Sequence, residues 1–190
     1  MVRAVAFGVL CVLAAAPAAA WDTSVERDVP RGGFIYDVKI GAQVHDVPYL
    51  WSGFHKEPYG VDLNFEMMFS PSVTFLGGAI RPALGATINF EGYTSKVYLD
   101  ARWQWECCWG AFFALGLGIA VHDGQVDSLV WDPVNKQLGR RVLFHPNAEW
   151  GYRIDEHNSL SIFFEHISNA STAPKNQGLD TLGIRYGYRF

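Results

Sequence analysis

The sequence predicts an all-β fold, an eight-stranded antiparallel up-and-down transmembrane β-barrel, and three observations lead to it. Apolar and polar residues alternate with a period of two in eight runs of about ten residues. Trp and Tyr gather near the ends of these runs, as they do at membrane–water interfaces. Long and short connections also alternate along the chain, as in barrels whose two ends face different compartments.

The N-terminal segment predicts a cleaved signal peptide over residues 1–20, followed by the barrel over 21–190. Arg3 precedes an apolar run, and Ala18–Ala20 offers small residues at a cleavage site before Trp21. A transmembrane helix is the alternative, but the run is rich in Ala, contains Pro17 and lacks a basic flank after it.

The first four strands are predicted at 34–44, 59–69, 80–90 and 97–106. In "FIYDVKIGAQV" the apolar set falls on even positions and the polar set on odd positions. The next three runs alternate in the same way, with the apolar set on odd, even and odd positions in turn, and Asp62, Arg81 and Asp100 each lie on the less apolar face.

The last four strands are predicted at 109–121, 142–152, 159–168 and 180–190. The fifth opposes large apolar residues to small ones such as Gly116 and Gly118, which predicts close packing under interior side chains. The sixth is less regular, and the last two form a C-terminal hairpin.

The charged residues decide which face of the sheet lies inside. They occupy the non-apolar face, so a membrane barrel encloses them as ion pairs and turns its apolar face to lipid. A soluble barrel of the lipocalin type would invert this arrangement. The charged set includes Asp37, Lys39, Arg81, Asp100, Arg102 and Glu165.

The connections predict the orientation. The longer ones, at 46–57, 123–140 and 169–179, are expected outside the cell, and the short turns near 70–78, 106–109 and 153–158 in the periplasm. Cys107 and Cys108 fall in one short turn, and the sequence leaves open whether they are paired or free. Phe190, in phase with Tyr186 and Tyr188, resembles the terminal signal read by the outer-membrane assembly machinery.

Composition and motifs exclude several classes of function. The net charge is −4 and no basic block is present, so nucleic acid is not an expected partner. The sequence has no GxSxG motif, which excludes an α/β-hydrolase. No histidine pair has metal-ligand spacing, so we expect no metal and no cofactor, and interpret most histidines as polar filler.

Three polar residues on the last hairpin break the apolar face. His166 and Ser168 continue the face of Leu160–Ile162–Phe164, and Asp180 continues the matching face of the next strand. If His166 pairs with Asp180, their Cβ atoms lie about 5 Å apart, with Ser168 about 6.6 Å further along. These spacings predict a nucleophile, a base and an orienting acid for acyl hydrolysis.

The depth of these residues in the membrane is consistent with such a site. Ten tilted residues separate Asp180 from Phe190, a rise of about 24 Å against an apolar band of about 25 Å. Asp180 is therefore expected at the outer rim, where a polar residue costs only about 0–1 kcal/mol. Acyl chains join the sugar of an outer-leaflet glycolipid at this level.

The segments "EHISNAS" and "KNQGLDTLGIRYGYRF" resemble the C-terminal motif of PagL-type outer-membrane lipid A deacylases over about the last 30 residues. The resemblance implies hydrolysis of an ester-linked 3-hydroxyacyl chain of lipid A, without a cofactor and with a homodimer allowed. It implies His166 as general base, Ser168 as nucleophile and an acid at 180. Backbone N–H groups near Asn169 and Ala170, with the Asn176 side chain, are implied to hold the oxyanion.

One position departs from that family. Glu is the usual acid there, whereas this chain has Asp180, so the shorter side chain requires a closer approach to His166. The competing interpretation is a non-catalytic barrel, a structural anchor or an adhesion protein, in which His166 and Ser168 are interfacial polar residues.

Overall fold

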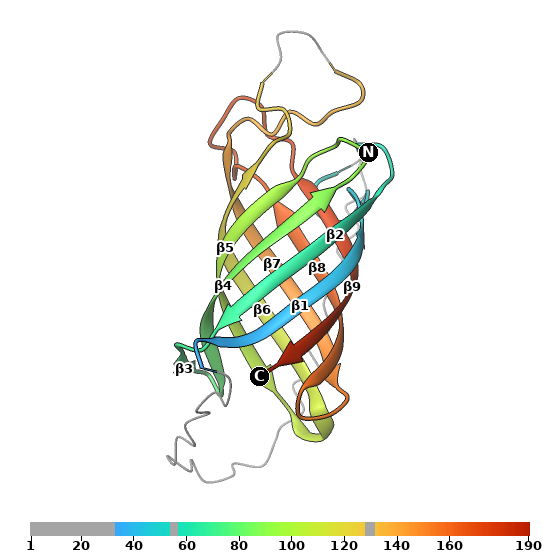
Figure 1. Cartoon of the computed structure of the whole chain (residues 1–190). Helices are drawn as coiled ribbons and strands as arrows, with labels where there is room; N and C mark the ends of the chain where they lie inside the picture. The colour runs from blue at the N-terminus through green and yellow to red at the C-terminus, as the bar shows by residue number, and fades with distance from the viewer. Residues whose placement is uncertain (1–32, 54–56, 128–131) are drawn as a thin grey trace, which may run out of the picture.

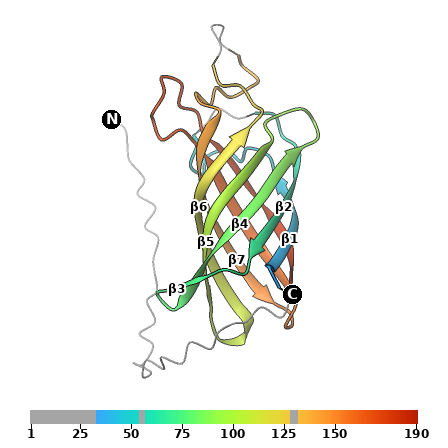
Figure 2. The same ribbon diagram turned by 60° about the vertical axis from the view of Figure 1, so that its left-hand side comes forward.

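The computed structural model describes residues 33–53, 57–127 and 132–190. The predicted signal peptide, residues 1–20, lies outside the described residues. Nine strands form one antiparallel sheet, and eight of them close into a barrel (Figures 1 and 2). The strands are β1 (Ile35–Val44), β2 (Val61–Phe69), β3 (Val73–Phe75), β4 (Gly78–Asn89), β5 (Lys96–Glu106), β6 (Ala111–His122), β7 (Val142–Arg153), β8 (Asn158–Ile167) and β9 (Leu179–Arg189).

The predicted barrel is confirmed, and its eight strands start and end within a few residues of the predicted runs. Successive strands of the barrel pair with one another, with β2 paired to β4 and β3 outside the ring. β1 pairs with β9 to close the ring, for example through Val38 and Tyr188. The cysteine pair lies in the β5–β6 turn as predicted, beside a short 3₁₀ turn (Cys108–Gly110). Within the described residues, no helix is long and apolar enough to cross a membrane.

Strand β3 is absent from the predicted pattern, since 70–78 was predicted to be a short turn. Val73–Phe75 has strand-forming side chains and pairs back onto β4. Leu76 and Gly77 both have positive φ, 47° and 73°, as a two-residue hairpin turn requires.

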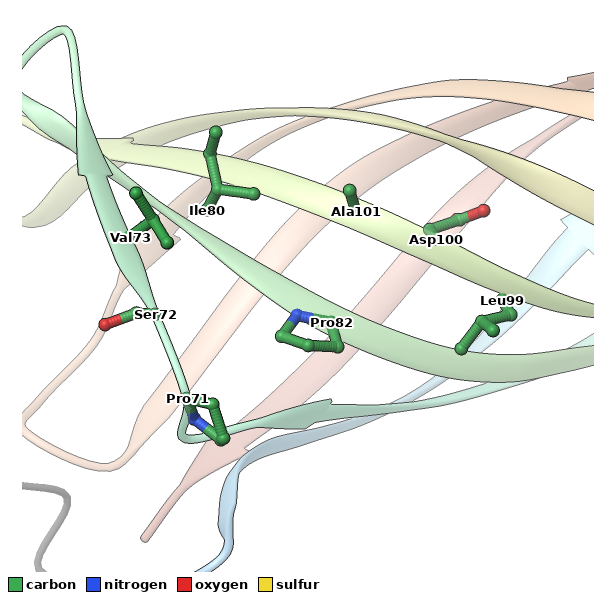
Figure 3. A pocket seen from close by; sticks show the side chains of 8 residues that line it. All are labelled: Pro71, Ser72, Val73, Ile80, Pro82, Leu99, Asp100 and Ala101. Atoms are coloured by element: carbon green, nitrogen blue, oxygen red, sulfur yellow. The ribbon is translucent and has the colours of Figure 1, made fainter.

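A groove of about 550 Å³ lies beside β3 on the outer surface of β4 and β5 (Figure 3). Val73, Ile80 and Leu99 give it an apolar lining. Asp100 also borders it, but its carboxylate bonds inward to His145. Apart from Ser72, the groove is therefore bordered by apolar side chains, as the outward face of a membrane barrel is.

The two faces of the sheet follow the predicted alternation. Ile40 is 49% exposed, whereas its neighbour Lys39 is 2% exposed and reaches Glu149 at 2.7 Å. Arg102 and Arg185 also bond Glu149. The inside is a network of ion pairs, as predicted, and the outside is an apolar surface.

Three loops lie at the end of the barrel that is predicted to face outward, which is called the outer end below. Leu138, from the β6–β7 loop (123–141), is fully buried against Leu143, Ile167 and Leu179. Figures 1 and 2 show the described parts of this loop, of the β1–β2 loop (45–53 and 57–60) and of the β8–β9 loop (168–178) at the end opposite the C-terminus. These three loops position the groups described next.

Candidate active site

His166 and Asp180 form a direct cross-strand pair at the outer end of β8 and β9. The register places the two residues opposite each other. His166 Nδ1 lies 2.6 Å from Asp180 Oδ1, so the imidazole N–H donates to the carboxylate. This direct pairing gives the short Asp side chain the close approach that it needs.

The β1–β2 loop holds the other side of this pair. The backbone N–H groups of Trp51 and Ser52 donate to Asp180 Oδ2 at 2.6 and 2.8 Å. The Trp51 indole stacks on the His166 ring, with centroids 4.6 Å apart and planes 12° apart. The carboxylate is thus bonded through both oxygens, and the imidazole is covered on one face.

The β1–β2 loop covers this pair, which changes the expectation that its side chains face lipid. His166 and Asp180 lie on the outward parity, as the sequence predicts, but they are only 4% and 0% exposed. The covering loop shields them, so these polar groups do not meet lipid directly. Desolvation under the loop also strengthens the hydrogen bond between them.

Ser168 lies one step beyond the end of β8 and remains half-buried. Its backbone pairs with Phe144 of β7 through two hydrogen bonds of 2.9 and 3.2 Å. Ser168 and His166 line the same pocket of about 390 Å³, together with Trp51, Ala170 and Asn176. The structure thus brings the predicted nucleophile and base to one open cavity.

The predicted oxyanion residues divide into two groups. Ala170 and Asn176 line the pocket beside Ser168. Ala170 has a left-handed backbone with φ of 51°, and Asn176 Oδ1 accepts the N–H of Ser171 at 3.1 Å. The Asn169 side chain points elsewhere and donates to the carbonyls of Leu138 and Lys175. It holds two loops together, and Asn169 is not among the residues that line this pocket.

A buried lysine connects the three loops behind the site. Lys136 Nζ donates to Asp46 Oδ1 at 2.7 Å and to the Gly178 carbonyl at 2.6 Å. Gly178 lies so close to the imidazole that a Cβ built there would stand 2.6 Å from His166 Cε1. Lys136 therefore anchors both the covering loop and the backbone beside the base.

His45 anchors the same loop to the barrel wall. Its ring bonds Asp62 of β2 at 2.8 Å and Glu57 of the loop at 2.9 Å, and it stacks on Tyr93. Burial acts to lower the pKa of His45, but the two carboxylates outweigh it and raise the pKa to about 9. Above that pH, a neutral ring can donate to only one of its two partners.

We expect stability to fall as the pH rises through about 9. The folded pKa of His45 exceeds its ordinary value of 6.5, so its contribution is complete below about 6.5 and is lost as the pH passes 9. Urea unfolding in detergent micelles between pH 6 and 10 measures this loss. The His45→Gln variant should lose less stability over the same range, and an unchanged pH slope would refute the assignment.

Several of these residues carry no signal in the sequence. Trp51, Ser52, Asp46 and Lys136 lie in loops without periodicity, and the last of them is 90 residues from its Asp46 partner. Of these residues, only Trp51 has a side-chain type that is typical of a membrane interface. Among the described residues, no group of three His, Cys, Asp or Glu side chains could hold a metal ion.

Comparisons with known proteins give a family and a fold. The sequence model of the family described as "Lipid A 3-O-deacylase (PagL)" matches residues 19–189. No curated protein matches the sequence. The crystal structure of the outer membrane enzyme PagL aligns with a TM-score of 0.59 at 15% identity, covering 82% of this chain and 99% of that one.

Two further outer-membrane barrels align more loosely. Neisserial surface protein A gives a TM-score of 0.48 at 11% identity, covering 82% of this chain and 97% of that one. The Yersinia pestis outer membrane protein Ail gives 0.44 at 14% identity, covering 83% and 99%. The PagL alignment establishes the fold, that of an integral outer-membrane barrel, and carries no information on residue roles.

Proposed function

Because the chain belongs to the lipid A 3-O-deacylase family, we propose that it is an outer-membrane esterase that removes the 3-position hydroxyacyl chain of lipid A through Ser168, His166 and Asp180. The observation that carries this proposal is that His166, hydrogen-bonded to Asp180, lines the same pocket as Ser168. An acid, an imidazole and a hydroxyl in this order are the groups that acyl hydrolysis needs.

The reaction proceeds in two halves. His166 removes the Ser168 proton as Oγ attacks the ester carbonyl, and then protonates the departing sugar hydroxyl. This leaves an acyl-Ser168 ester. Water, activated by the same imidazole, attacks that ester and releases the fatty acid, and the proton returns to Ser168. Asp180 keeps the N–H of His166 on Nδ1, so that Nε2 is free to accept the proton.

Backbone and amide N–H donors beside Ser168 stabilise the negative charge that develops on the carbonyl oxygen of the ester. The Ser168 N–H is committed to the Phe144 carbonyl, so it cannot serve. Ala170 and Ser171 both have positive φ. Their backbone N–H groups therefore do not alternate in direction as they would in a strand. We assign the oxyanion to the N–H groups near Ala170 together with the amide of Asn176, which lines the same pocket.

The location of the site supports a lipid substrate. The catalytic groups lie at the outer end of strands whose outward residues Ile162, Ile184 and Leu160 are each more than half exposed. A lipid in the outer leaflet can therefore bring its ester group to Ser168 while its chains stay against the barrel wall. A water-soluble ester would have no use for this apolar surface.

Mass spectrometry of lipid A from cells that express the protein tests the proposal. We expect the lipid A to lose the mass of one 3-hydroxyacyl chain, and the loss to require the barrel in the outer membrane. An unchanged lipid A, with folded protein recovered from the outer membrane, would mean that the barrel is not a deacylase.

A further inference from the structure

A second pocket lies on the other side of the loop that carries Ser168. It measures about 330 Å³, and the outward side chains of Ile119, Val142 and Phe144 form its apolar floor. These three side chains are between 47% and 50% exposed. Arg140 and Thr172 form a polar edge to the same pocket. An apolar floor with one cation at its edge matches a ligand that carries both a hydrocarbon chain and an anionic group.

The two pockets share the segment 168–172 as a common wall. Ser168, Ala170 and Ser171 line the first pocket, whereas Asn169 and Thr172 line the second. Phe144, on the floor of the second pocket, is the backbone partner of Ser168. Residues paired in this way have Cα atoms about 4.5–5.5 Å apart. One ligand can therefore occupy both pockets.

The Arg140 guanidinium is fixed in place at the edge of this pocket. Nε donates to Thr172 Oγ1 at 3.0 Å and Nη2 donates to the Thr172 carbonyl at 2.6 Å. The Arg140 carbonyl accepts from His122 Nε2 at 2.7 Å, which holds the backbone as well. These bonds use the Nε–Nη2 edge of the guanidinium, and Nη1 has no hydrogen-bond acceptor among the described residues, so it is available to an anion.

The neighbouring cation differs from Arg140 in its role. Arg141 Nη1 donates to the carbonyls of His122 and Gly124 at 2.7 and 2.9 Å, so its charge closes the loop onto β6. Arg140 instead bonds Thr172 and makes no ion pair with a carboxylate in the described part of the chain, so its charge is not neutralised there.

We propose that this second pocket binds a phosphate group of lipid A through Arg140, with an adjacent acyl chain on the Ile119–Val142–Phe144 floor, while the scissile ester lies over Ser168. This rests on the proposed function, because it assigns part of the same substrate. Lipid A is an acylated glucosamine disaccharide that carries phosphates, and a guanidinium recognises phosphate by paired, charge-assisted hydrogen bonds. Arg140 would thus set which lipid is accepted and how its sugar is oriented.

Kinetics on two substrates test the assignment. Purified wild-type, Arg140→Gln and Lys175→Gln proteins are compared in detergent micelles on diphosphorylated lipid A and on the same lipid after enzymatic removal of its phosphates. Lys175 is an exposed cation on the same loop as Ser168, so its variant controls for a general loss of positive charge. Heat-modifiable migration in gels verifies that each barrel is folded.

For the phosphorylated lipid, Arg140→Gln should raise KM about tenfold or more with little change in kcat. For the dephosphorylated lipid, it should change KM by less than about twofold, and Lys175→Gln should have little effect on either lipid. Equal losses on both lipids, or an equal effect of Lys175→Gln, would overturn the assignment. An equal effect of Lys175→Gln would mean that this end of the barrel attracts anionic lipids by its positive charge alone.

A binding measurement separates this proposal from the proposed function. Native mass spectrometry of Ser168→Ala protein, with and without Arg140→Gln, counts bound lipid A in the presence of excess phosphatidylglycerol. Loss of bound lipid A with Arg140→Gln supports the phosphate site even if no lipid is hydrolysed. Equal retention by both proteins, or displacement by phosphatidylglycerol, overturns it.

Discussion

Replacing Ser168 with alanine is expected to lower the rate of lipid A deacylation by a factor on the order of 10³ or more and to leave the barrel folded. The reaction would lose the nucleophile that the proposal assigns to Ser168. The strand pairing survives because the Ser168 backbone, not its side chain, bonds Phe144. Mass spectrometry of the lipid against time measures the rate.

The double variant Ser168→Ala/His166→Gln sharpens this test. Nucleophile and base act as one unit, so the double variant should be no slower than either single variant. Ser171→Ala is the matched control, because Ser171 lines the same pocket and its hydroxyl accepts a hydrogen bond from Asn176 Nδ2. Its rate should stay within about tenfold of wild type. Residual activity of Ser168→Ala near that of Ser171→Ala would exclude Ser168 as the nucleophile.

Asp180→Asn is expected to have the second largest effect, a loss on the order of 10²–10⁴ in rate. Asp180 accepts hydrogen bonds on both oxygens, from His166 on one side and from Trp51 and Ser52 on the other. An amide has one oxygen, so its NH₂ must face either the imidazole or the covering loop. In the first case the imidazole is held in the wrong tautomer, and in the second the loop loses its anchor.

Asp180→Glu is the companion variant for that experiment. It keeps the acid but adds a methylene to a pair already in contact at 2.6 Å, so the covering loop must shift. A loss smaller than that of Asp180→Asn is expected, with the pH dependence of the rate preserved. If Asn and Glu at this position proved equally harmful, packing and not the charge of Asp180 would be what the site requires.

The fold was predictable because strand alternation is a local property. Side chains in a strand change face at every residue, so the inward and outward sets can be read from the sequence without knowing the partner strand. His166 and Asp180 could be placed opposite each other for the same reason, since a hairpin brings together residues only 14 apart. The short strand β3 was missed because its three residues are too few to show a period.

Other parts of the candidate site could not be read in this way. The hydrogen bonds from Trp51 and Ser52 to Asp180 join residues 129 and 128 apart, and the bond from Lys136 to Asp46 joins residues 90 apart. Loops have no repeating pattern that records such contacts. The partners of the inner charges are equally invisible, as the ion pair of Lys39 with Glu149 shows across 110 residues.

The sequence by itself determined the barrel, the outward parity of His166, Ser168 and Asp180, and their level near the outer end, because each follows from counting residues along a strand. Only the tertiary structure decided that this outward pair is buried, since closure of the barrel brings the β1–β2 loop over β8 and β9. The same closure gave Asp180 its second set of donors and placed Arg140 beside the loop of Ser168. Short-range geometry thus set where the reactive groups lie, and long-range loop packing set the environment in which they work.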